Sequence, residues 1–67
     1  MKLETEEIPG NKISEIDISE GSTYEEVLHN LGINSETVLL LSDGQAVPLD
    51  GTVVPGTLKI LYIALGG

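Results

Sequence analysis

The sequence has 67 residues, of which 11 are acidic and 3 are Lys or Arg, for a formal net charge of -8. A chain of this size buries only about 60% of the surface that it exposes when unfolded. We therefore expect a single domain over residues 1–67, with a thin core and no deep catalytic cavity. The sequence contains no cysteine, which excludes disulfide frameworks, thiolate metal sites and a side-chain thiol nucleophile.

The acidic balance and the scarcity of aromatic residues argue against direct nucleic-acid binding, because such binding uses a cationic surface and stacking side chains. A partner protein with a basic surface is the natural complement, although the same charge also keeps a small protein soluble or suits a saline cytoplasm. No apolar run is long enough to span a bilayer, and residues 1–7 are too charged for a signal peptide. We expect a cytoplasmic protein without membrane contact that is a monomer when free.

Two alternating segments on either side of Pro9–Asn11 predict a β-hairpin over residues 1–18. Pro followed by Gly supplies the negative and then positive φ of a type II turn. The apolar residues favour a register with Leu3 opposite Ile18, but that register also sets acidic residues against one another on the outer face. The hairpin is therefore better supported than its register.

The segment that follows predicts one short amphipathic helix. Two pairs fit a capping box at its start, and both remain open: Ser22 with Glu25, and Thr23 with Glu26. Gly32 suits the left-handed residue that ends a helix. The apolar residues fall at the spacing of a single helical stripe: Tyr24, Val27, Leu28 and Leu31.

Three further strands are predicted in the second half of the chain. Val38–Leu41 is a continuous apolar run, and the Asp-Gly step after it predicts a hairpin with a short returning strand over Ala46–Pro48. Leu49–Thr57 is rich in Gly, Pro and Asp and predicts an irregular connection, whereas Leu58–Leu65 is the strongest strand of the chain. The order β-β-α-β-β-β predicts an α+β fold, with a single sheet and one helix across one face.

No group of residues predicts catalysis by the chain itself. His29, the only histidine, lies away from the apolar stripe of the helix and is expected to be solvated. The carboxylates lack the spacing of metal ligands, and no glycine-rich phosphate loop is present. We expect no catalytic residue, no metal site and no cofactor bound by this chain.

The last strand predicts a binding surface. If Leu58, Ile60 and Tyr62 face the helix, the residues of the other parity form a mostly apolar row on an uncovered sheet face, which is typical of a partner site: Lys59, Leu61, Ile63 and Leu65. The alternative is that these residues reflect strand propensity alone.

Gly66-Gly67 is the second unusual feature, because two glycines without Cβ keep the chain slender and flexible. A terminal carboxylate on such a tail can enter a narrow channel of another protein and be approached closely by a nucleophile or nucleotide. The alternatives to a functional role for these glycines are that the chain is truncated here or that they are a frayed end.

Three stretches of the sequence resemble the ubiquitin-like β-grasp sulfur carriers and modifiers of the MoaD/ThiS type, and most closely the small archaeal ubiquitin-like modifiers. They are Gly21–Leu28, Asp43–Pro48, and the run from Leu58–Leu61 to Gly66-Gly67. The resemblance covers essentially the whole chain. It implies a β-grasp domain over residues 1–67, with a mixed sheet of four to five strands, one helix, and a flexible C-terminal Gly-Gly tail.

The resemblance also implies a function. An E1-like enzyme of the MoeB/ThiF type, which holds the ATP and Mg, would adenylate Gly67. The activated end would then become a thiocarboxylate that supplies sulfur for tRNA thiolation, molybdopterin or thiamin, or it would be joined to lysines of target proteins. The face with Lys59, Leu61, Ile63 and Leu65 would dock on the activating enzyme. The alternative is a β-grasp interaction module, or a small subunit of an enzyme complex, whose glycines are never activated.

Overall fold

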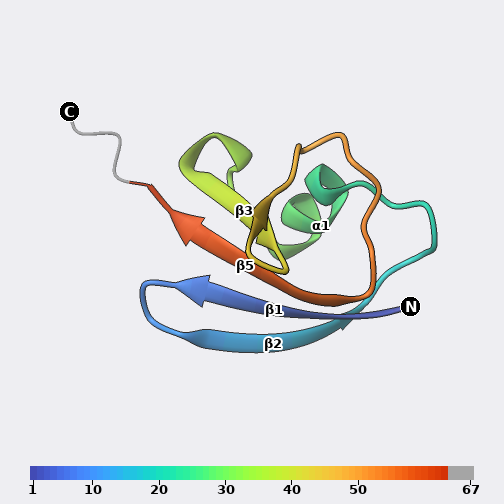
Figure 1. Ribbon diagram of the computed structural model, residues 1–67, viewed down its shortest axis with the longest axis horizontal. Helices are drawn as coiled ribbons and strands as arrows, with labels where there is room; N and C mark the ends of the chain where they lie inside the picture. Colours follow the sequence, from blue (N-terminus) through green and yellow to red (C-terminus); the bar gives the residue numbers. More distant parts are fainter. Residues whose placement is uncertain (64–67) are drawn as a thin grey trace.

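The computed structural model describes residues 1–63 and has an α+β architecture, with one five-stranded mixed sheet among these residues. The elements are β1 (Lys2–Ile8), β2 (Lys12–Asp17), α1 (Tyr24–Leu31), the 3₁₀ turn η1 (Ser35–Thr37), β3 (Val38–Ser42), β4 (Gln45–Ala46) and β5 (Gly56–Tyr62). The strand order is β2-β1-β5-β3-β4; β1 and β5 are parallel, and the other neighbours are antiparallel. In Figure 1 the arrows of β1 and β5 lie side by side and point the same way, and α1 lies across one face of the sheet.

The first hairpin forms as predicted, but the predicted register was wrong by two residues. Leu3 lies opposite Ile16, and Ile18 instead exchanges two hydrogen bonds with Met1, of 2.8 and 3.1 Å. This register pairs Glu7 with Lys12 beside the turn, so that opposite charges replace part of the like-charge pairing that the predicted register required.

The turn of this hairpin has the positive φ that was predicted for its third residue, because the φ of Gly10 is 106°. The Ile8–Pro9 peptide bond is cis, and Asn11, which follows the two central residues of the predicted turn, also has a positive φ, of 50°; the sequence predicted neither feature.

Helix α1 begins with the second of the two predicted capping boxes. The Thr23 hydroxyl accepts from the Glu26 N–H at 3.3 Å, and the Glu26 carboxylate accepts from the Thr23 N–H at 3.2 Å. Ser22 is used differently, because its carbonyl accepts from the Val53 N–H at 2.9 Å. The helix ends at Gly32, whose φ of 73° is the left-handed conformation predicted for it.

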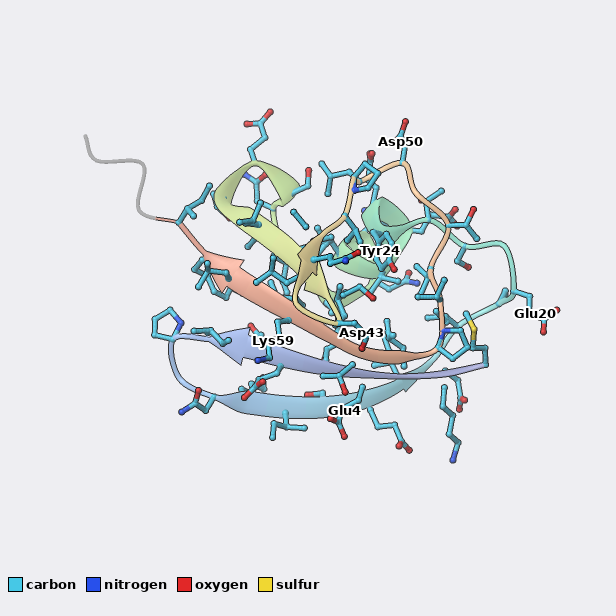
Figure 2. All side chains as sticks on the ribbon, viewed as in Figure 1. Glu4, Glu20, Tyr24, Asp43, Asp50 and Lys59 are labelled. Atoms are coloured by element: carbon cyan, nitrogen blue, oxygen red, sulfur yellow. The ribbon has the colours of Figure 1, made fainter. Side chains whose placement is uncertain are left out.

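The core lies between α1 and the sheet face that it covers. The predicted stripe is confirmed: Tyr24, Val27 and Leu28 are buried, and Leu31 packs against them at the margin. Figure 2 shows Tyr24 inside the molecule, whereas Glu20 and Asp50 project away from it. The buried apolar residues are Leu3, Ile18, Tyr24, Val27, Leu28, Val38, Leu40, Val53, Leu58 and Ile60.

The second half of the chain differs from prediction at the strand ends. Asp43 and Gly44 both have positive φ and form the predicted two-residue hairpin turn, but the returning strand is only Gln45–Ala46. Strand β5 begins at Gly56, earlier than the predicted Leu58, because the residues from Gly56 onward already pair with β1. It ends at Tyr62, so Ile63 follows the strand. Ala64 and Leu65, predicted as strand, lie outside the described residues.

Candidate functional site

The candidate site is the sheet face opposite α1, which we call the outer face. Residues that are direct partners in neighbouring strands share a face, so the register defines its rows. Nearest the end of β5 is an apolar row in which Leu61 has Ile8 on one side and Leu39 on the other. Leu39 is 42% exposed, and Ile8 and Leu61 are half-buried. We refer to Ile8, Leu61 and Leu39 as the apolar row.

The next row of the outer face is mixed. Lys59 lies between Glu6 on β1 and Leu41 on β3, with Ile13 beyond Glu6 on β2. Lys59 is exposed, and the one ion pair within 4 Å among residues 1–63 joins Lys2 to Glu15 instead, at 3.6 Å. The ammonium of Lys59 is therefore available to a binding partner.

The row farthest from the end of β5 is acidic. Glu4 and Glu15 are direct cross-strand partners, a like-charge pair that is moderated by Lys2 beside Glu15 and by a hydrogen bond of 3.3 Å from the Thr57 hydroxyl to Glu4. Figure 2 labels Glu4 on the hairpin and Lys59 on β5. The outer face thus changes from acidic to apolar along the direction of β5.

The chain leaves the sheet at the apolar end of this face. The Ile63 N–H donates to the Thr37 carbonyl at 3.0 Å, and the Tyr62 hydroxyl donates to a Glu7 carboxylate oxygen at 2.7 Å. The hydrogen bond to Glu7, partial desolvation and the negative charge of Glu7 together raise the pKa of Tyr62. The pairing of Tyr62 with the buried Val38 places it on the helix side of the sheet, as the sequence predicted, but the side chain is 38% exposed at the end of the strand. The sequence did not predict the contact with Glu7, because only the parallel pairing of β1 with β5 brings the two side chains together.

The predicted site residues are only partly covered by the structure. Lys59 and Leu61 lie on the outer face as expected, and Ile63 is 41% exposed just after β5. Leu65, Gly66 and Gly67 lie outside the described residues. Leu39 and Ile8 were not predicted for this surface, because only the pairing of β5 with β1 and β3 brings them beside Leu61.

The solvent side of α1 does not have the chemistry of an active site. His29 is exposed, as predicted, and borders an open depression of about 360 Å³ whose other lining residues come from the same helix and its cap: Thr23, Glu25, Glu26 and Asn30. In residues 1–63, no three His, Asp or Glu side chains are grouped so that they could hold a metal ion. Within the same residues, no helix is long and apolar enough to cross a membrane.

The strand order, the parallel β1–β5 pair and the single helix across one face define this chain as a ubiquitin-like protein with a β-grasp fold. The sequence matches the family model described as Small archaeal modifier protein 2 over residues 1–63. The chain therefore belongs to the small archaeal modifier protein 2 family, a group of ubiquitin-like archaeal modifiers.

Individual relatives agree with this assignment. The small archaeal modifier protein 2 of Haloferax volcanii is 30% identical over 63 residues, which are 94% of this chain and 96% of the relative. An uncharacterized protein of Archaeoglobus fulgidus is 40% identical over 47 residues, which are 70% of each chain.

Proposed function

We propose that this modifier acts through Gly67, which an E1-like enzyme adenylates at the expense of ATP. A carboxylate oxygen of Gly67 attacks the α-phosphorus of ATP, pyrophosphate leaves, and the resulting acyl adenylate reacts further with loss of AMP. In one branch, hydrosulfide supplied by a sulfur-donating partner displaces AMP from the acyl adenylate and gives a thiocarboxylate, which then serves as a sulfur donor. In the other branch, the ε-amine of a lysine of a target protein displaces AMP, loses a proton and forms an isopeptide bond. The nucleotide and its Mg²⁺ belong to the activating enzyme, and this chain is its co-substrate.

Membership of the small archaeal modifier protein 2 family is the observation that carries this proposal. The chemistry needs no catalytic side chain from this protein, because the reacting group is a main-chain carboxylate and the remaining machinery belongs to the partner. Gly66 supports the reaction by its small size, since a residue without Cβ allows close approach to a nucleotide.

The outer face is the surface that we propose for docking on the activating enzyme. Its apolar row is nearest to Ile63, so a partner that binds this row holds the domain close to the point where the chain leaves the sheet. The acidic row with Glu4 and Glu15 favours a partner whose matching surface combines an apolar contact with basic side chains at one end. Lys59 lies between the acidic row and the apolar row, and its exposed ammonium can pair with an acidic group of that partner.

Intact-mass analysis of the protein purified from its own cells tests this function. Replacement of one terminal oxygen by sulfur is expected, or branched peptides in which a lysine of another protein carries a Gly-Gly remnant. Only the free carboxylate, in cells that contain a competent activating enzyme, would contradict the proposal and favour an interaction module whose glycines are not activated.

A further inference from the structure

At its C-terminal end, β5 makes different backbone contacts with its two neighbouring strands, β3 and β1. On the side of β3, the pairing continues to Val38 opposite Tyr62, and the Ile63 N–H adds a hydrogen bond to Thr37. On the side of β1, the pairing stops one residue earlier, at Ile8 opposite Leu61. Strand β1 therefore offers no backbone partner at the level of Tyr62.

The side chains of Glu7 and Tyr62 supply the missing contact on that side. Glu7 lies opposite Ile60, and Tyr62 is two residues further along β5 on the same face, so its ring reaches back along the face toward β1. The resulting hydrogen bond of 2.7 Å has an anionic acceptor, which makes it stronger than a bond between neutral groups. It joins residues that are 55 positions apart in the sequence.

The hydrogen bond between Glu7 and Tyr62 contributes little to the stability of the core. Both residues lie outside the buried cluster, and their hydrogen bond is exposed to solvent, where such contacts add little to the free energy of unfolding. The position of this hydrogen bond in the fold indicates its role. Tyr62 is the last residue of β5, and Ile63 is the residue from which the C-terminal segment continues.

We propose that Glu7 and Tyr62 are positioning residues, which fix the direction of the chain at Ile63 so that the C-terminal segment enters the active site of the activating enzyme when the outer face is docked. This inference rests on the proposed function. A fixed starting direction reduces the number of conformations that the segment must search after docking, and orientation of this kind acts on the rate of the chemical step more than on binding.

The test compares Tyr62→Phe and Glu7→Ala with Glu7→Gln, which loses the same charge as Glu7→Ala but keeps an acceptor oxygen. In amide hydrogen exchange followed by NMR, Ile63 is expected to exchange about three to ten times faster in Tyr62→Phe and Glu7→Ala, and at an intermediate rate in Glu7→Gln. The matched control for exchange is Thr57→Val. It removes the other hydroxyl–carboxylate bond between β5 and β1, at the opposite end of β5, and should leave Ile63 unchanged.

The second readout is steady-state adenylation by a purified E1-like enzyme, measured as pyrophosphate release with hydrosulfide present as the acceptor that displaces AMP and allows turnover. Tyr62→Phe and Glu7→Ala are expected to lower kcat about three- to tenfold while KM changes less than about twofold, with Glu7→Gln closer to the unmodified protein. An effect confined to KM, or equal effects of Glu7→Ala and Glu7→Gln on kcat, would overturn the positioning role.

The remaining outcomes separate this inference from the proposed function. If the amide exchange rate of Ile63 is unchanged in both Tyr62→Phe and Glu7→Ala, the inference is overturned, regardless of the kinetic results. Faster exchange at Ile63 with unchanged kcat also overturns it. In both cases, normal adenylation of the unmodified protein leaves the proposed function standing. Failure of a competent enzyme to adenylate the unmodified protein rejects the proposed function, and the positioning role with it.

Discussion

Leu39 on β3 and Leu61 on β5 are direct cross-strand partners on the outer face of the sheet, where Leu39 is 42% exposed and Leu61 is half-buried. Neither residue belongs to the buried cluster that holds α1 on the sheet. An apolar pair that is uncovered in the isolated domain is typical of a surface that is buried in a complex.

Substitution of Leu61 by Asp is expected to weaken binding to the activating enzyme by about tenfold or more, because it introduces a charge into the centre of the apolar row. Isothermal titration calorimetry measures the affinity, and circular dichroism checks that the domain remains folded. Val54→Asp is the matched control, since Val54 is 49% exposed in the connection before β5 and the change in net charge is the same. Equal losses of affinity in both variants would show that overall charge, and not this face, governs docking.

Deletion of Gly67 is expected to abolish adenylation without lowering the melting temperature. Among residues 1–63, the buried cluster extends from Leu3 to Ile60, and the deletion leaves all of these residues in place. Differential scanning calorimetry and the pyrophosphate assay test the two halves of this prediction. A large fall in melting temperature would contradict it, because the C-terminal residues would then be structural.

Thr23→Ala is expected to destabilise the domain by about 1 kcal/mol, because it removes the hydroxyl that caps α1 and its bond with Glu26. The control is Ser22→Ala, since Ser22 takes part through its carbonyl, which the substitution preserves. Urea unfolding followed by circular dichroism gives both free energies of unfolding. A larger loss in Ser22→Ala would mean that the capping box at the preceding residue operates in solution.

The Tyr62 phenol is expected to ionise at higher pH in the folded domain than in the unfolded chain, where its ordinary pKa is 10.0. Since the folded pKa is the raised one, the stability that this hydrogen bond contributes is complete below pH 10.0 and is lost as the pH rises through the folded pKa. NMR of tyrosine labelled at Cζ follows the titration directly. In Glu7→Ala the pKa of Tyr62 should fall toward its ordinary value; no change in that variant would contradict the assigned cause.

The features that could be predicted from the sequence are those determined by neighbours along the chain. The apolar stripe from Tyr24 to Leu31, the stop at Gly32 and the turn at Asp43-Gly44 follow from local spacing and backbone preference, and the structure confirms them.

Contacts between distant segments could not be predicted in the same way. Ser22 and Thr23 were equivalent caps in the sequence, and the structure distinguishes them through Val53, which binds the Ser22 carbonyl from another part of the chain. The hairpin register depends on contacts of Met1 with Ile18, and the bond between Glu7 and Tyr62 depends on the parallel pairing of β1 with β5. No local pattern specifies either pairing.

The place of β5 in the sheet has a consequence for biosynthesis. Strands β1 and β3 are not neighbours, and β5 is the strand that joins them (Figure 1). During translation, the hairpin and the segment from α1 to β4 emerge first, but the sheet cannot close until Gly56–Tyr62 has left the ribosome. A chain that terminates before this strand lacks the closed sheet as well as the glycines that follow, so a product of incomplete synthesis would not offer a folded domain for the docking proposed above.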